Sequence, residues 1–230
     1  MLGGNWWFAS AWEISPVLAI GWALWVIGSI VLHELAHGWA AIRQGDDTPI
    51  HTGHMTWNPM VHMGPTSLIV FAVVGIAWGM MPVDPSRFRS RHGDAIVAFA
   101  GPLMNVSLAA VAAVLYVVWI GTGGGYWTGW SAGEPLFSNA QLFLRVGITI
   151  NLLLAIFNML PVPPLDGSRI LASVYPPFRR LWEGEHAGVL GLILFAGVFF
   201  FGGPYIFGMA RGLTTEILDM LLRAFVPGAV

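Results

Sequence analysis

The sequence contains no cysteine and no lysine, and only 10% of its 230 residues are charged. The absence of cysteine excludes disulfide bonds, thiolate zinc sites and cysteine nucleophiles together. A soluble domain carries about 25% charged residues, so this chain has too few charges to cover a surface that faces water. The net charge of −2 argues against a nucleic-acid-binding surface.

The chain also lacks signals that would divide it. The opening segment MLGGNWWFASAWEIS has no basic residue, so it lacks the positive region of a cleaved signal peptide, and the first hydrophobic run is expected to be retained. The sequence shows no internal repeat, no low-complexity tract and no long linker. We therefore expect residues 1–230 to form a single membrane domain.

Hydrophobic residues, by contrast, make up 56% of the chain, and its mean hydropathy is +0.71. The 12 Trp residues suit the two bilayer interfaces. A spanning helix needs about 20 predominantly apolar residues. Stretches without charge that approach or exceed this length cover residues 14–33, 95–133 (with a core ending near 120), 146–165 and 187–210. The pattern predicts an all-α polytopic membrane protein.

Two further segments have mixed features. Residues 66–83 form a shorter run that contains Gly75, Gly79 and Pro82. Residues 211–230 alternate charges with Leu and Ile, which fits either an interfacial amphipathic helix or a sixth, poor span. We therefore expect one or two helices in the C-terminal region, at about 185–226.

The arginines predict the orientation of the spans. They cluster in three separate loops, at Arg43, at 87–91 and at 169–180, whereas the loop at 121–140 has no basic residue. Because Arg-bearing loops stay in the cytoplasm, we expect these three loops inside and the Gly-rich loop GTGGGYWTGWSAGEP outside.

This orientation constrains residues 66–83. If they crossed the bilayer, Arg43 and the cluster at 87–91 would lie on opposite sides. We therefore interpret residues 58–82 as a re-entrant segment or hairpin packed against protein, as irregular backbone at membrane depth requires. Three spans then precede residue 166, running out-to-in, in-to-out and out-to-in. A real fifth crossing stays open as the alternative.

The segment VLHELAHGW, residues 31–39, places a His-Glu-x-x-His pattern at the end of the first apolar run. On a helix, His33 and His37 project from one face, one turn apart, which suits two ligands of one Zn²⁺. Glu34 lies beside them and is placed to take a proton from water. A chance match is disfavoured, because each ionisable residue inside a membrane-spanning segment costs about 3 kcal/mol.

A catalytic zinc site has three protein ligands, so a third must come from elsewhere. Asp46 and Asp47 lie in a solvated turn past the helix end, and Glu183 and Glu185 lie in a charged loop. Asp166 follows an apolar run that ends in prolines, which cannot continue a helix, and we expect an Asp-Gly turn there. The three alternating spans put Asp166 on the same side of the membrane as the histidines, so we predict Asp166 as the third ligand.

Two asparagines precede Asp166 on one face of the same apolar run, at Asn158 and Asn151. Either could form an interhelical hydrogen bond worth about 0.6–2 kcal/mol. We favour this interpretation for Asn151. For Asn158 we favour the alternative, a donor to the substrate backbone or to the developing oxyanion.

Three motifs in this order resemble the site-2 protease family of intramembrane zinc metalloproteases: HELAH, AGPLMN at 100–105 and NMLPVPPLDG at 158–167. The stretch HMTWNPMVHMGPTS at 54–67 resembles the compact prokaryotic branch of that family. The match covers roughly residues 20–170. It implies that His33, His37 and Asp166 bind one Zn²⁺ per chain, that Glu34 activates water, and that Asn158 is the motif asparagine.

The resemblance also implies a fold and a function. We expect a three-helix catalytic core, about residues 14–170, with its site sunk into a prokaryotic cell membrane near the cytoplasmic face. The expected partners are the lipid bilayer and a transmembrane protein or peptide substrate, which must unwind before hydrolysis. Two other hypotheses are a zinc transporter, which needs ionisable residues along the membrane depth, and an inactive zinc-binding scaffold.

The chain departs from the family pattern in two places. The family's His-x-Asp-Pro run reads His62-Met63-Gly64-Pro65 here, so a carboxylate is missing and the role of His62 is open. We interpret His51 and His54 as loop histidines. The outside loop has about 20 residues, too few for the PDZ domain of larger relatives, and no CBS pair follows. We expect a minimal catalytic core.

Overall fold

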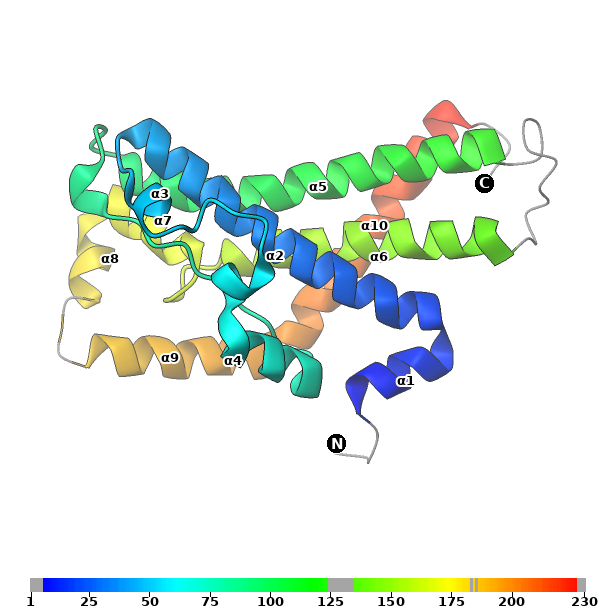
Figure 1. Cartoon of the computed structure of the whole chain (residues 1–230), viewed down its shortest axis with the longest axis horizontal. Helices are drawn as coiled ribbons and strands as arrows, with labels where there is room; N and C mark the ends of the chain where they lie inside the picture. Colours follow the sequence, from blue (N-terminus) through cyan, green and yellow to red (C-terminus); the bar gives the residue numbers. More distant parts are fainter. Residues whose placement is uncertain (1–5, 124–134, 183, 185, 227–230) are drawn as a thin grey trace.

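The computed structural model describes residues 6–123, 135–182, 184 and 186–226. In these ranges every regular element is helical (Figure 1), so the expected all-α class is confirmed. In chain order they are α1 (Trp7–Ile14), α2 (Pro16–Gln44), α3 (Thr48–His51), α4 (Pro59–Val74), a 3₁₀ turn (Pro85–Arg87), α5 (Gly93–Gly123), α6 (Pro135–Asn158), α7 (Asp166–Val174), α8 (Pro176–Leu181), α9 (Ala187–Gly197), a π turn (Val198–Gly202) and α10 (Gly203–Phe225). Most of the predicted outside loop, with Glu134, and the loop residues Glu183 and Glu185 lie outside the described ranges.

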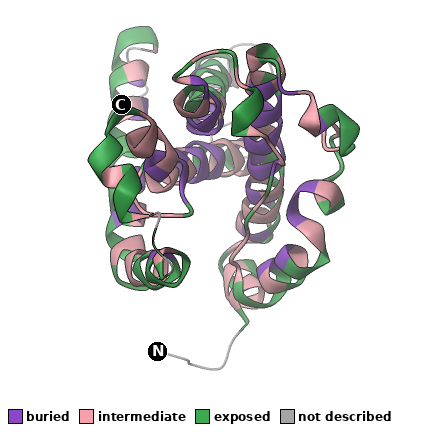
Figure 2. Ribbon diagram, turned by 90° about the vertical axis from the view of Figure 1, so that its left-hand side faces the viewer, coloured by how far each residue is buried: buried purple, intermediate pink, exposed green. Residues whose placement is uncertain are grey.

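Among the described residues, four helices are long and apolar enough to cross a membrane: α2, α5, α6 and the bent helix from Ala187 to Phe225. The first three pack against one another as the expected three-helix core (Figure 1). Buried residues gather between the helices, and exposed residues cover their outer sides (Figure 2). α6 begins at Pro135 rather than at residue 146. A single arginine is a good helix former, so excluding Arg145 placed the predicted start too late.

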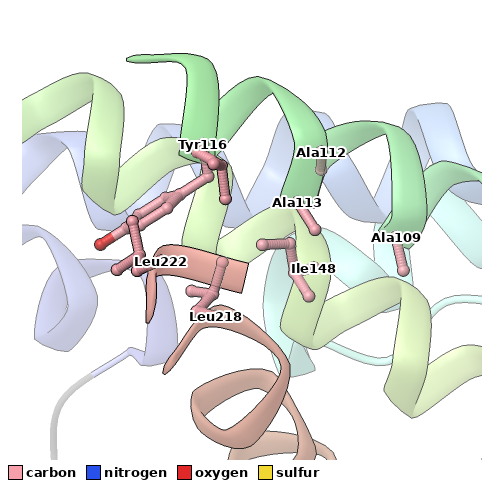
Figure 3. Close-up of a cluster of buried hydrophobic side chains, with 8 residues drawn as sticks. Ala109, Ala112, Ala113, Tyr116, Ile148, Leu218 and Leu222 are labelled. Atoms are coloured by element: carbon pink, nitrogen blue, oxygen red, sulfur yellow. The ribbon is translucent and has the colours of Figure 1, made fainter. Parts of the chain in front are cut away.

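Small side chains on α5 let its neighbours approach closely. In one buried cluster Ala109, Ala112 and Ala113 of α5 face Ile148 of α6 and Leu218 of α10 (Figure 3). Helices in a membrane associate through van der Waals packing of this kind, because lipid tails are as apolar as the side chains. The alanine face therefore holds α6 and α10 against α5.

The chain between α2 and α5 leaves and returns at the same end of the molecule. The Arg89 amide donates to the carbonyl oxygen of Gln44 at 2.8 Å, next to Arg43. The ion pair of Arg169 with Asp94, at 2.7 Å, brings α7 to the start of α5. The Arg-bearing loops thus share one end of the molecule, as the three alternating spans predict.

α4 and the extended segment after it form a hairpin. α4 has 16 residues, fewer than the about 20 needed to span a bilayer, and it is kinked at Gly64, where φ is 68°. The returning segment pairs with it: the Ser67 hydroxyl donates to the Trp78 carbonyl at 2.7 Å, and the Met80 amide donates to the His62 carbonyl at 2.9 Å. The hairpin expected at about 58–82 is confirmed.

The C-terminal region contains two helices, but the break between them differs from the predicted boundary. It falls in the π turn Val198–Gly202, and α10 runs without interruption through Arg211. The charged residues after position 210 do not end the helix, because Arg and Glu favour helical backbone. Only 11% of the 18-residue apolar stretch of this bent helix is buried, whereas 33–39% of the corresponding stretches of α2, α5 and α6 is buried.

Candidate metal centre

α2 carries the two histidines of the metal pattern deep in the three-helix core. Helical spacing puts His33 and His37 on one face, and their rings reach α5 and α7. They are only 7% and 4% exposed. Buried polar groups are costly without partners, so the contacts of each ring nitrogen decide what the pair can do.

Asp166 is the first residue of α7 and is 8% exposed. α6 ends at Asn158, and the proline-rich segment after it forms turns instead of helix. A Cβ added at Gly167 would clash with the carbonyl oxygen of Met159 and lie 2.5 Å from that of Leu160, so only glycine lets α7 fold back against α6. The chain therefore reverses before Asp166, and the predicted Asp-Gly turn is the first turn of a helix.

The three side chains form a compact triangle of donor atoms, the metal triangle. His33 Nε2 lies 3.1 Å from Asp166 Oδ2 and 3.0 Å from His37 Nε2, and His37 Nε2 lies 3.4 Å from the same carboxylate oxygen. Ligands about 2.0–2.1 Å from a tetrahedral zinc lie about 3.3 Å from one another. Within the described ranges, this is the one His/acid group of three that could hold a metal.

Each histidine is oriented by a hydrogen bond from its other ring nitrogen. His33 Nδ1 lies 2.6 Å from Asn105 Oδ1, and His37 Nδ1 lies 2.7 Å from the carbonyl oxygen of Val97. Both partners are acceptors, so each Nδ1 carries the proton and donates it. The Nε2 lone pairs then remain free to bind a metal.

Behind His33, a relay of two asparagines links α5 and α6. Asn105 Nδ2 donates to Asn151 Oδ1 at 3.0 Å, and Asn151 Nδ2 donates to the carbonyl oxygen of Gly147 at 2.9 Å. Both asparagines are fully buried. The interhelical hydrogen bond expected of Asn151 is confirmed. Sequence reasoning missed Asn105 as an individual residue, although its polar side chain in the apolar run AGPLMN was a signal.

Two glycines leave space around the reacting groups. A Cβ at Gly101 would lie 2.5 Å from His37 Nε2 and closer still to His33 Nε2. At Gly79, a Cβ would lie 2.6 Å from Oε1 of Glu34, whose side chain is buried. Among the described residues no side chain hydrogen-bonds the Glu34 carboxylate, so it is available for proton transfer.

The other residues considered from sequence lie outside the metal triangle. The Asn158 amide donates to the Leu154 carbonyl of its own helix at 3.0 Å, and its substrate role stays a prediction. His62 Nε2 lies 2.7 Å from the Thr56 carbonyl oxygen. His51 pairs with Asp47 at an exposed position, and the half-buried His54 bonds to Thr52.

Asp46 and Asp47 close the loop after α2 instead of binding metal. Asp46 is fully buried and accepts hydrogen bonds from Thr48 and from the Asp84 amide. Arg87 forms ion pairs with both aspartates. Burial alone would raise the pKa of Asp46, but these hydrogen bonds and the Arg87 charge outweigh it and hold that pKa below its usual value.

Comparison with known proteins identifies the family. The sequence model of peptidase family M50 matches residues 21–142 and 126–201. The chain belongs to peptidase family M50. A Bacillus subtilis (strain 168) protein named "Putative zinc metalloprotease YwhC" is 33% identical over 206 residues, which cover 88% of this chain and 91% of that protein. No solved structure matches the chain significantly.

Two less similar proteins are also named putative zinc metalloproteases. MJ0611 of Methanocaldococcus jannaschii is 30% identical over 75% of this chain and 78% of its own length. Rip3 of Mycobacterium tuberculosis (strain ATCC 35801) is 28% identical over 91% of this chain and half of its own length. The resemblance to zinc metalloproteases of the site-2 protease type is thus confirmed.

The donor set suits the metal of the M50 family. Two imidazole nitrogens and one carboxylate oxygen are ligands that zinc accepts, and three protein ligands leave one position open, as catalytic zinc sites require. The free Nε2 lone pairs and the distances between the three donor atoms also fit a bound zinc ion. The chain is therefore an integral membrane metalloprotease with Zn²⁺ as its cofactor.

Proposed function

We propose that this M50 peptidase is an intramembrane endopeptidase that hydrolyses peptide bonds within or near transmembrane segments of other membrane proteins. His33, His37 and Asp166 would hold one zinc ion, and Glu34 would act as the general base. One observation supports this most directly: three buried donor atoms meet beside Glu34, and the two histidines and Glu34 belong to a helix long enough to span a membrane.

When bound, zinc supplies a Lewis acid that polarises the scissile carbonyl and lowers the pKa of water toward about 7. Glu34 takes a proton from the attacking water and returns it to the leaving amine. The Nδ1 hydrogen bonds keep His33 and His37 in the tautomer that presents Nε2 to the metal. Asn158, at the end of α6, would hold the substrate backbone.

A substrate helix must unwind first, because its own hydrogen bonds shield the peptide bonds. The extended segment that touches Glu34 offers backbone partners. Trp78 and Met80 use backbone groups to pair with α4, whereas Ala77 and Gly79 make no backbone hydrogen bond within the described residues. Unpaired groups are costly at membrane depth, so we propose that an unwound substrate strand pairs with them.

We also propose that the protein lies in a prokaryotic cell membrane with its zinc centre toward the cytoplasm. The Arg-bearing loops share one end of the molecule, and such loops stay in the cytoplasm. His37 lies seven residues before the end of α2 at Gln44, about 10 Å by helical rise. Water therefore has a short path to the centre from that end.

Zinc content and cleavage of a reporter transmembrane substrate test these roles in three variants. Glu34→Gln should keep zinc and lose cleavage by at least about 100-fold, because a general base is worth that much. Asp166→Ala should lose zinc, because a ligand is removed. Glu216→Gln, at an exposed position on α10, should change neither and serves as the control.

Each outcome separates the hypotheses. Unchanged cleavage in Glu34→Gln would reject the protease proposal, and zinc binding without cleavage in wild type would favour an inactive scaffold. Zinc uptake into proteoliposomes without cleavage would favour a transporter. Full zinc occupancy in Asp166→Ala would reject Asp166 as a ligand.

A further inference from the structure

Arg145 places a positive charge within the apolar helix α6, and Arg211 is the first charged residue of α10, which carries three more charges toward its end. Arg145 is the only charged residue of α6 and lies ten residues after Pro135, about 15 Å along the axis. Arg211 lies eight residues after the start of α10, which packs against α6. Ionisable side chains at membrane depth are costly and mark functional sites.

Arg145 and Arg211 line one cavity of about 450 Å³ between α6 and α10, the arginine cavity. It is lined by Arg145, Thr149, Gly208, Arg211, Gly212 and Thr215. No carboxylate is among these residues, and within the described part of the chain neither arginine forms an ion pair. Arg211 lies over the ring of Phe207, 5.9 Å from its centroid, but neither positive charge has a carboxylate partner among the described residues.

The threonines cannot supply the missing negative charge, and their protons are already in use. The hydroxyls of Thr149 and Thr215 donate to carbonyl oxygens of their own helices. Thr215 accepts one hydrogen bond from Arg145 Nη2 at 2.9 Å, whereas each guanidinium has five N–H donors. This surplus of donors matches the paired acceptor oxygens of a carboxylate.

α10 also leaves its backbone open beside the arginines. Gly208 and Gly212 stand one turn apart in a Gly-x-x-x-Gly pattern, and a Cβ added to either would meet nothing within 4 Å. This spacing lets the backbone of a second transmembrane helix approach closely. A short acidic side chain on such a helix could then reach both guanidinium groups.

We propose that the arginine cavity binds a transmembrane helix of another protein, which packs on Gly208 and Gly212 and carries an Asp or Glu at the depth of Arg145. A second copy of this chain fits less well, because a two-fold contact at these glycines would bring the two Arg211 side chains together. A lipid phosphate fits less well too, because Arg145 lies about half of the 30 Å hydrocarbon thickness from the helix end.

Fluorescence energy transfer in phosphatidylcholine vesicles tests the proposal with the full-length protein. The probes are two Leu/Ala transmembrane peptides that differ in one central residue, Asp or Asn. Wild type should bind the Asp peptide about tenfold more tightly, as expected for a desolvated charge pair. The preference should disappear when Arg145→Gln and Arg211→Gln are combined. Gly212→Leu should weaken both peptides, and Arg223→Gln, outside the cavity, should change nothing.

Equal affinity of wild type for the two peptides would overturn the proposal, and this comparison needs no variant. A preference that persists in the double variant would overturn it too, because the pairing charge would lie elsewhere. A second arm replaces the peptides with phosphatidylglycerol. Arginine-dependent enrichment of this lipid, without an Asp preference, would assign the cavity to a lipid phosphate instead. Zinc content, measured in each variant, shows whether the three-helix core is intact.

Discussion

The metal triangle and the arginine cavity both place ionisable side chains inside apolar helices, but they differ in how these side chains are paired. In the metal triangle the second nitrogen of each histidine has an acceptor within the chain, and the remaining donor atoms converge on one point. In the arginine cavity Arg145 donates to Thr215 and Arg211 lies over the ring of Phe207, but within the described residues neither charge has an ion-pair partner. In our proposals a small ion completes the metal triangle, whereas an anionic side chain from another protein completes the arginine cavity.

This difference follows from the free-energy cost of removing each kind of side chain from water. Neutral imidazoles with satisfied Nδ1 groups can be buried at modest cost, and a buried charge without a partner cannot. Accordingly, the metal triangle lies in the three-helix core, and both arginines are exposed at the surface of the described helices. Four predictions test this contrast, from the largest expected effect to the smallest.

Gly101→Ala should abolish zinc binding. The added methyl group would lie against Nε2 of both histidines, where the metal has to bind, so we expect at least about 100-fold weaker zinc affinity and no cleavage. Metal analysis of the purified protein measures this. Gly28→Ala is the control on α2, because a Cβ there meets nothing within 4 Å. Normal zinc content in Gly101→Ala would show that the helices can separate at this point.

Asn105→Ala should weaken zinc binding by about 10–100-fold, because it removes the acceptor that orients His33. Competition with a chelator measures the affinity. Ser107→Ala, at an exposed position of the same helix, should have no effect. If Asn105→Ala bound zinc as tightly as wild type, the relay to Asn151 would serve helix packing alone.

Arg145→Leu should stabilise the protein in a bilayer that contains no partner, by about 1 kcal/mol, because it removes an unpaired charge from an apolar helix. Zinc content should not change. Reversible unfolding in mixed detergent measures the stability. Arg223→Leu, near the end of α10, should change it little, since a side chain there reaches the interface. A loss of stability in Arg145→Leu would mean that the hydrogen bond from Arg145 to Thr215 outweighs the cost of the charge.

The smallest effect concerns Asp46, a buried carboxylate whose partners all belong to the chain. Its pKa is lower in the folded protein than in the unfolded chain. Its stabilising contribution is therefore complete above the unfolded value of about 4 and is lost as the pH falls through the folded value. Amide hydrogens at Thr48 and Asp84 should exchange faster below about pH 4. Asp46→Asn should remove this pH dependence, and an unchanged profile would contradict the assignment.

Local pattern was enough to predict much of the fold and the three residues that meet in the metal triangle. Helical periodicity alone puts His33 and His37 on one face, and prolines alone end α6 before Asp166. The arginine distribution predicted that the chain between α2 and α5 returns to its starting end, which the hydrogen bond between Arg89 and Gln44 bears out. Each of these inferences depends on residues close in sequence or on a charge rule for whole loops.

Sequence alone thus settled the membrane class, the His-Glu-x-x-His helix and the choice of Asp166 for the third place in the triangle. Tertiary structure decided what surrounds them: the Asn105–Asn151 relay, the space at Gly101, the close approach at Gly167, and the meeting of Arg145 with Arg211. The reason is physical. Periodicity and helix breaking act over one or two turns, whereas these contacts join different helices and depend on how closely the helices pack.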